Sequence, residues 1–318
     1  MNWRAGVTRL IELLLVLFIV SVGVFFMVTL IPGDPAVAIL GGGKPPEMYA
    51  ALRQELGLDD PFLTRYLDWF GGLLQGDLGH SIVPPQHAVI DRITSALPVS
   101  LQLAVMGLGM ALIIAIPLAM WAAAKPGGAV DRLISASMFG LLSVPSFLAG
   151  LLLIMLLVNE LGIFPRSQWV RLSDSFAGNL EHAFLPALVI ALSEVAVFTR
   201  ILRNDLVITL QEDFVLASRA KGMPPWRVMV GDALRPSSFT LVTLLGISTG
   251  RLIGSTVVVE YLFSLPGMGS LVVSAAQSGD FPVVQGAVLV IAFIYVVLNA
   301  LIDVSYGLID PRTRRVHA

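Results

Sequence analysis

Long apolar stretches alternate with short polar ones along most of the 318-residue chain. A helix that crosses the hydrocarbon core of a membrane needs about 20 consecutive, mostly apolar residues. The sequence therefore predicts six membrane-spanning helices, at residues 10–31, 98–122, 133–158, 184–202, 239–259 and 283–309. The third is expected to kink at Pro145, and the fourth is the weakest because it is short and contains Pro186 and Glu194.

Composition supports this pattern. Hydrophobic residues make up 56% of the chain and charged residues 13%, whereas soluble domains have about 45–50% and 25%. Thirteen of the 20 Lys and Arg residues fall in the connections on one side, which also holds both termini, and six fall on the other side. Because basic residues favour the cytoplasmic side, the prediction is an all-α integral membrane protein with cytoplasmic N- and C-termini.

The connections between the spans divide the chain further. An N-terminal part with the first span (1–31) is followed by an extracytoplasmic segment (32–97), a five-helix core (98–309) that contains a cytoplasmic loop (204–237), and a short tail (310–318). Helical spacing of apolar residues predicts short amphipathic helices at 47–56 and 61–74 on the outer membrane face. Another outer element, 261–282, is expected to break at Pro266-Gly267 and to contain a short helix at 270–278.

Several kinds of chemistry have no support in the sequence. The chain has no cysteine and four histidines, none in an HxxxH pair, so we expect no metal site. It contains no GxxxxGK[ST], GxSxG or HExxH pattern. We therefore expect no catalytic residues, no cofactor bound to this chain, no enzymatic activity and no nucleic-acid partner.

Charged residues inside the spans are costly and need a partner or an aqueous path. Glu194 and Arg251 are the deepest, and they form either a structural ion pair or part of a substrate path. Gly246, Gly250 and Gly254 lie four residues apart in the fifth span. This spacing allows close helix approach, either within the chain or with a second subunit.

The main candidate for a functional site is a polar stretch, residues 212–236, between the fourth and fifth spans. Asp213 to Lys221 is compatible with a helix, Gly222 ends it, and Pro224-Pro225 prevents a simple continuation. A second short helix follows, with an apolar side containing Trp226 and Met229. Helix, break and helix form a rigid elbow. The alternative is a solvated loop that is basic only because Lys and Arg favour the cytoplasmic side.

This stretch resembles the cytoplasmic "EAA" loop of permease subunits of bacterial ABC importers, in particular the dipeptide/oligopeptide/nickel group. The matching residues are Ser218-Arg219-Ala220-Lys221-Gly222 and Ala233-Leu234-Arg235. Four further stretches resemble elements of the same family, namely Pro32-Gly33-Asp34-Pro35, Gly76-Asp77-Leu78-Gly79, Pro266-Gly267-Met268-Gly269 and Asp310-Pro311-Arg312. The resemblance covers nearly the whole chain in order, and the long segment after the first span is similar to the first of the two permease types.

The resemblance implies a permease with the type I ABC importer fold in the bacterial plasma (inner) membrane, surrounded by lipid. Its expected partners are a second permease subunit, two ATPase subunits that carry ATP and Mg, and an extracytoplasmic substrate-binding protein. The expected cargo is di- or oligopeptides, with nickel chelates or glutathione as alternatives within the group. The residues expected to couple to an ATPase subunit are Ala217, Arg219, Ala220, Lys221, Gly222, Pro224, Pro225, Trp226, Arg227 and Met229.

An ATP-independent secondary transporter is the alternative function. Its working residues would be Glu194, Arg251 and Asp303. Such transporters often contain internal inverted repeats, and the sequence shows no convincing repeat. The importer is therefore the preferred hypothesis.

Overall fold

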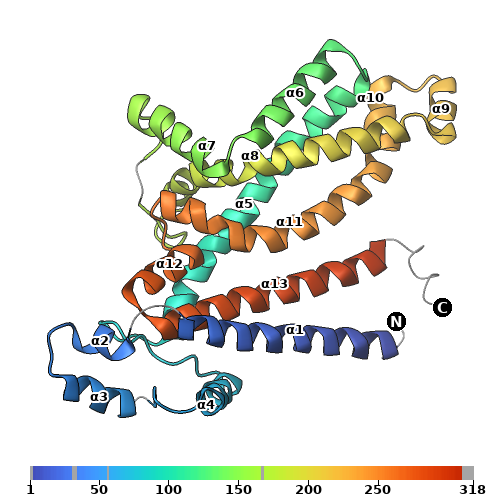
Figure 1. Cartoon of the computed structure of the whole chain (residues 1–318). Coiled ribbons are helices and arrows are strands. Elements are labelled where there is room, and N and C mark those ends of the chain that lie inside the picture. The colour runs from blue at the N-terminus through green and yellow to red at the C-terminus, as the bar shows by residue number, and fades with distance from the viewer. Residues whose placement is uncertain (1–2, 31–33, 56, 166–167, 310–318) are drawn as a thin grey trace. The chain divides into compact units, whose positions relative to one another are not determined.

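The computed structural model describes residues 3–30, 34–55, 57–165 and 168–309. Side-chain surroundings are described in these ranges except at residues 3–10, 28, 30, 38, 251, 253–255 and 302–309. In these ranges every regular element is a helix, apart from an isolated bridge between His80 and Ala88 (Figure 1). The elements are α1 (Trp3–Leu30), α2 (Pro35–Leu40), α3 (Pro46–Glu55), α4 (Phe62–Leu74), α5 (Val89–Ala124), α6 (Ala129–Ser143), α7 (Ser146–Leu153), the π-helix η1 (Ile154–Glu160), α8 (Phe176–Thr209), α9 (Asp213–Ala220), α10 (Pro225–Arg227), the π-helix η2 (Val228–Ala233), α11 (Leu234–Leu262), α12 (Met268–Ser278) and α13 (Phe281–Ile309).

The short helices agree well with the sequence-based expectations. Those predicted at 47–56, 61–74 and 270–278 are confirmed as α3, α4 and α12, with ends that differ by one or two residues. Helix α2 was not predicted, although its start carries a recognisable cap. The side chain of Asp34 accepts a hydrogen bond from the backbone N–H of Ala36 at 3.0 Å, and Pro35 occupies the first helical position.

The chain forms two compact units. The first unit comprises Met1–Ser100 and Pro266–Val297, and the second comprises Leu101–Leu265 and Leu298–Ala318. Each is therefore assembled from segments that lie far apart in the sequence.

In the first unit, α4 packs its aromatic side chains on α1. Tyr66 is buried, and its ring lies edge-on to that of Phe25, with 5.5 Å between the centroids. Phe62 makes a similar contact with Phe25 at 5.3 Å. The hydroxyl groups of Tyr66 and Ser21 are 2.8 Å apart, so the buried phenol keeps a hydrogen bond. Another face of α4 exposes Leu63, Leu67 and Leu74.

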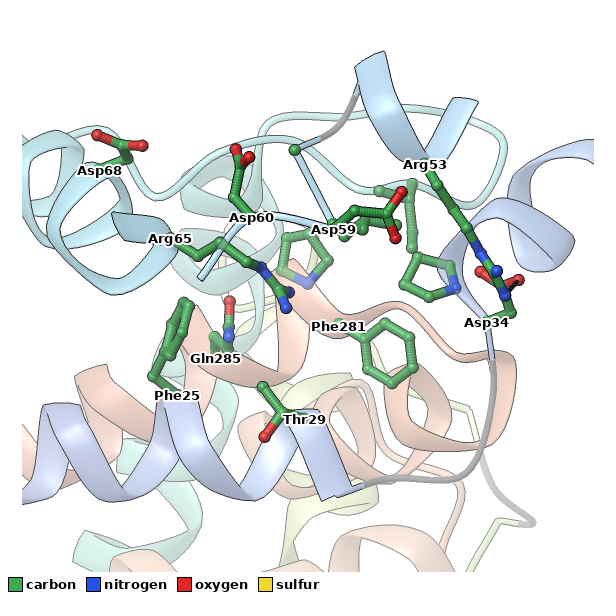
Figure 2. Close-up of a pocket in the computed structure, with 15 residues that line it drawn as sticks. Phe25, Thr29, Asp34, Arg53, Asp59, Asp60, Arg65, Asp68, Phe281 and Gln285 are labelled. Carbon is green, nitrogen blue, oxygen red and sulfur yellow. Dashed lines mark hydrogen bonds and ion pairs between the residues drawn. The ribbon is translucent and has the colours of Figure 1, made fainter. Parts of the chain in front are cut away.

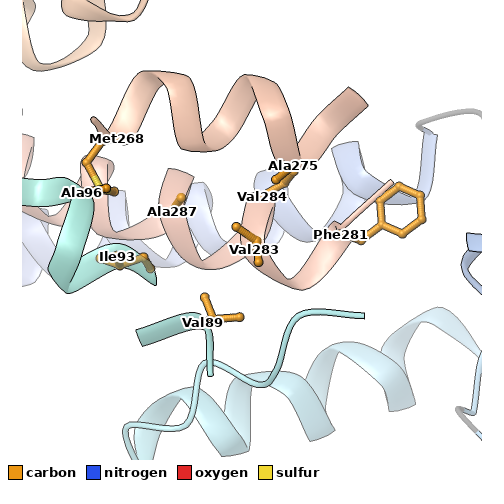
Figure 3. Packing of buried hydrophobic residues seen from close by; sticks show 9 residues of the cluster. All are labelled: Val89, Ile93, Ala96, Met268, Ala275, Phe281, Val283, Val284 and Ala287. Carbon is orange, nitrogen blue, oxygen red and sulfur yellow. The ribbon is translucent and has the colours of Figure 1, made fainter. Parts of the chain in front are cut away.

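A second cluster in this unit joins α5, α12 and α13. Val89 and Ile93 of α5 pack with Val283 and Ala287 of α13 and with residues of α12 (Figure 3). Gly286 makes this approach possible, because a Cβ atom at that position would lie 2.6 Å from Cγ1 of Val89.

Next to this cluster, the fully buried carboxylate of Asp280 fixes the loop that precedes α5. It accepts hydrogen bonds from Ser81 Oγ at 2.5 Å and from the backbone N–H of Ile82 at 3.1 Å. Nη1 of Arg92 forms an ion pair with Oδ2 of the same carboxylate at 2.9 Å. The buried charge is thus paired and hydrogen-bonded, as a buried carboxylate requires.

Helix α8 is the centre of the second unit and packs against α6, α7 and α11. Most of its residues between Ala183 and Leu206 are buried, including Pro186. Gly107 of α5 lies so close to α8 that an added Cβ would be 2.6 Å from Cγ2 of Ile190. The apolar segment that was the weakest predicted span is therefore part of a long, largely buried helix.

The third predicted span differs from the expectation of a single kinked helix. The segments 129–143 and 146–160 form two helices bent by 99°. Val144 is extended, with φ −92° and ψ 121°, and Pro145 caps the start of α7. A residue before proline is pushed out of the helical region, so the backbone turns here and the expectation of a mere kink was wrong.

Three helices in the described residues are long and apolar enough to cross a membrane, namely Val89–Ala124, Phe176–Thr209 and Phe281–Leu301. The bent pair makes a fourth if it counts as one span, and Ile11–Met27 is a shorter apolar helix. An all-α membrane protein is thus confirmed, whereas the number of six spans and the side on which the termini lie remain predictions.

Candidate coupling loop

The candidate site lies in the second unit, where α8 is connected to α11. After α8 ends at Thr209, a short turn leads into α9, which packs against η2. Val215 of α9 and Val228 of η2 are both buried and anchor the two arms of the loop. Figure 1 shows α9 beside α10 at one end of α8 and α11.

Gly222 ends α9 in the manner that its sequence predicts. Its φ of +78° lies in the left-handed region, which glycine adopts without strain. The N–H of Gly222 donates to the carbonyl of Arg219 at 2.9 Å, and the N–H of Met223 donates to the carbonyl of Ser218 at 3.3 Å. These two bonds form a Schellman motif, so the turn has one defined geometry.

The second arm starts at the two prolines. Pro224 is extended, with φ −69° and ψ 145°, and Pro225 begins α10. Helices α10, η2 and α11 then follow one another without a break. The predicted arrangement of helix, break and helix is confirmed, and its second arm is continuous with the long helix α11.

Polar contacts hold the base of the loop. Ser237 Oγ donates to Thr209 Oγ1 at 2.9 Å and so joins the start of α11 to the end of α8. Arg203 of α8 binds both carboxylate oxygens of Asp131 of α6, with Nε–Oδ1 at 2.9 Å and Nη2–Oδ2 at 2.6 Å. The backbone N–H of Gly127 donates to the same carboxylate at 2.7 Å. The Arg203 guanidinium holds the pKa of Asp131 below its ordinary value.

The surface of the loop combines exposed apolar and basic side chains. Trp226 is 69% exposed, and Phe214, Leu216 and Val230 are each about half exposed. All of the predicted coupling residues lie on this surface, and among them only Met229 is half-buried; the exposed ones are Ala217, Arg219, Ala220, Lys221, Gly222, Pro224, Pro225, Trp226 and Arg227. Tryptophan and arginine beside other exposed apolar groups are typical of protein interfaces.

The intramembrane candidates lie elsewhere in the second unit. Glu194 of α8 is 1% exposed and accepts a hydrogen bond from Ser248 Oγ of α11 at 2.7 Å. The side chain of Arg251, its predicted partner, and that of Asp303 lie outside the described residues. Gly246 and Gly250 are buried, and the surroundings of Gly254 are outside the described part. The sequence missed Ser248 because a serine three residues before Arg251 carries no distinctive signal.

The sequence also missed a cavity in the first unit, with a volume of about 540 Å³ (Figure 2). Its wall contains Asp34, Asp59, Asp60 and Asp68 together with two arginines. The excess of acidic residues in the segment 32–97 was the only sequence signal for it.

Comparison with known proteins identifies the family. Residues 115–315 match the family of binding-protein-dependent transport system inner membrane components, and residues 3–104 match the N-terminal part of such membrane components. Together the two matches cover both units and the coupling loop. The ABC importer resemblance and the inner-membrane location expected from the sequence are thereby confirmed.

Similar proteins extend along nearly the full length. A putative peptide transport system permease protein of Brucella abortus is 34% identical over 96% of this chain and 97% of its own length. The oligopeptide transport system permease protein AppB of Bacillus subtilis is 34% identical over 91% of this chain and 92% of its own. The glutathione transport system permease protein GsiC of Escherichia coli is 34% identical over 97% and 98%. The chain therefore belongs to the family of inner membrane components of binding-protein-dependent transport systems.

Proposed function

We propose that this chain is a permease subunit of an ATP-driven importer and that it forms, with a second permease, the path by which peptides enter the cell. The observation that carries the proposal is the loop between α8 and α11, with its fixed turn at Gly222 and its exposed Trp226. Relatives named for peptide, oligopeptide and glutathione transport support short peptides as the cargo.

The loop provides a mechanical connection between the membrane helices and an ATPase subunit. Phe214, Trp226 and the basic residues around Gly222 form the docking surface. The Schellman turn and the Thr209–Ser237 bond make the loop stiff, so a push on it moves α8 and α11 together. The energy for the change between states comes from contacts that the ATPase makes better in one state than in the other.

The remaining parts of the importer belong to other chains. ATP and Mg bind to two partner ATPase subunits, which fits a sequence without a GxxxxGK[ST] pattern. A substrate-binding protein outside the membrane delivers the peptide. Purifying the tagged chain from its native membrane tests this composition, because a second permease and ATPase subunits should copurify with it. Recovery of the chain alone, in a detergent that keeps a known importer intact, would contradict the proposal.

Substitution of Gly222 tests the coupling role. Nothing lies within 4 Å of a Cβ atom at this position, so a larger side chain fits the chain itself and obstructs only a docked partner. Gly222→Arg should leave the complex assembled but uncouple peptide uptake from ATP hydrolysis in proteoliposomes. Gly222→Ala is the matched control, because it imposes the same left-handed strain without the bulk and should retain most of the uptake. Normal uptake by Gly222→Arg would refute the coupling role.

A further inference from the structure

The cavity in the first unit has the size of a small-molecule site. Its volume of about 540 Å³ lies within the range of about 300–1,000 Å³ of typical ligand pockets. Phe25 and Thr29 of α1 form one side, and Phe281 and Gln285 of α13 form another. The turn after α3 and the polar face of α4 enclose the rest (Figure 2).

Two charged residues of the wall already pair with each other. Arg53 of α3 binds Asp34, the cap of α2. The guanidinium lowers the pKa of Asp34, and the carboxylate raises the pKa of Arg53. This pair joins α3 to the start of α2 in the wall, and the two charges largely offset each other.

Charges of both signs remain available in the cavity. Within the described ranges, Asp60 and Asp68 have no side-chain hydrogen-bond or ion-pair partner, and Asp59 interacts with Arg53 only through its charge at longer range. Arg65 reaches into the cavity from α4, with its guanidinium 5.9 Å from the centre of the Phe25 ring (Figure 2), and it has no carboxylate partner in the same part of the chain. The site thus offers a cation and several anions to one ligand.

Gln285 adds a neutral polar group to the wall. The residue is 9% exposed and lines the cavity (Figure 2). Among the described residues its amide has no hydrogen-bond partner, and its polar atoms are reached by solvent. The amide is therefore open to water or to a ligand in the cavity. A bound molecule with its own donor or acceptor would satisfy this amide.

We propose that this cavity binds a short peptide in its zwitterionic form. Arg65 binds the peptide carboxylate, Asp59 and Asp60 bind the ammonium group, and Gln285 binds the peptide bond. Phe25 and Phe281 provide apolar contact for the side chains. This inference rests on the proposed function for the identity of the ligand, and it adds to that function a peptide site on the permease outside the substrate-binding protein.

The test is direct binding of radiolabelled alanyl-alanine to the assembled permease–ATPase complex, purified without the substrate-binding protein. Wild type should bind alanyl-alanine, and Arg65→Gln should weaken this binding by about tenfold or more, the loss expected for a charge-assisted hydrogen bond. Alanyl-alanine amide lacks the carboxylate, so wild type and Arg65→Gln should bind it equally. Gln285→Leu should weaken the binding of both peptides. Arg132→Gln, an exposed position in the second unit, is the control and should change neither.

The outcomes separate this inference from the proposed function. If wild-type complex takes up peptide but binds no alanyl-alanine, or if Arg65→Gln affects the dipeptide and its amide equally, the peptide site is refuted and the importer stands. If the complete importer fails to take up peptide, the proposed cargo is refuted whatever the binding result. If Arg65→Gln alters only the stimulation by the substrate-binding protein, the cavity is a contact site for that protein and the peptide site is again refuted.

Discussion

The ion pair between Asp131 and Arg203 allows a prediction with a definite magnitude. Arg203→Leu leaves the Asp131 carboxylate, 5% exposed, with only the N–H of Gly127 at 2.7 Å and the hydroxyl of Ser135 at 3.4 Å. Breaking a buried ion pair from one side costs about 3–5 kcal/mol. The Arg203 side chain is 24% exposed, which favours the lower end of this range, so we expect Arg203→Leu to reduce the free energy of unfolding by about 3 kcal/mol.

Asp131→Asn, which alters the other member of the ion pair, should be less destabilising than Arg203→Leu. It keeps the volume and an acceptor for Gly127, and the unpaired Arg203 can reach solvent, so the expected cost is about 1.5–3 kcal/mol. The assay is reversible unfolding in mixed detergent micelles, followed by circular dichroism, for wild type, both single variants and the double variant. A coupling energy above about 1 kcal/mol indicates a buried pair, whereas exposed pairs give about 0–1 kcal/mol. A loss below 1 kcal/mol in Arg203→Leu would refute the reasoning.

The same pair predicts a pH dependence. Arg203 lowers the pKa of Asp131 in the folded chain from its ordinary value of 3.8. The resulting stabilisation is complete above the unfolded pKa and is lost as the pH falls through the lower, folded value. The difference in unfolding free energy between wild type and Asp131→Asn should therefore be constant from pH 7 to about pH 5 and decrease in stronger acid. A difference that already falls between pH 7 and 6 would point to another titrating group.

Two further substitutions probe the packing. Gly107→Ala places a methyl group 2.6 Å from Cγ2 of Ile190 and should destabilise the chain by about 1–3 kcal/mol. Gly109→Ala, with open space around its Cβ, is the matched control, and equal melting temperatures for the two variants would contradict the close approach of α5 and α8. Tyr66→Phe removes the hydrogen bond with Ser21 and should cost about 1 kcal/mol, measured by the same unfolding assay. Ser21→Ala also removes the bond from Ser21 Oγ to the carbonyl of Phe18, so the double variant should lose less than the sum of the two single losses. Fully additive losses would show that the two hydroxyl groups do not interact.

Elements with strong local signals were predictable. Helix α4 repeats its apolar residues at helical spacing, and Gly222 with Pro224 and Pro225 determines the turn of the coupling loop through backbone chemistry alone. Helix α2 was missed because six residues show no period, although Asp34 and Pro35 mark its start.

Partners that depend on the tertiary fold were not predictable. The sequence indicates that Glu194 needs a partner inside the membrane, but several residues of the fifth span would serve, and it does not single out Ser248, which donates a hydrogen bond to Glu194. The 99° bend at Pro145 likewise depends on more than the proline, because a proline within a helix often produces only a kink. The π-helices η1 and η2 have no sequence signature of their own.

The position of Asp280 has a consequence for how the protein is made. Its partners Ser81 and Arg92 precede it by 199 and 188 residues. At about 5–20 residues per second, a ribosome needs roughly 10–40 seconds to reach Asp280 after Arg92 has been synthesised. During that interval Arg92 lacks its counter-charge, and Val89 and Ile93 lack the half of their core that α13 provides. The first unit to emerge is thus among the last to finish folding, and quality-control proteases can act on it until the last helix is inserted.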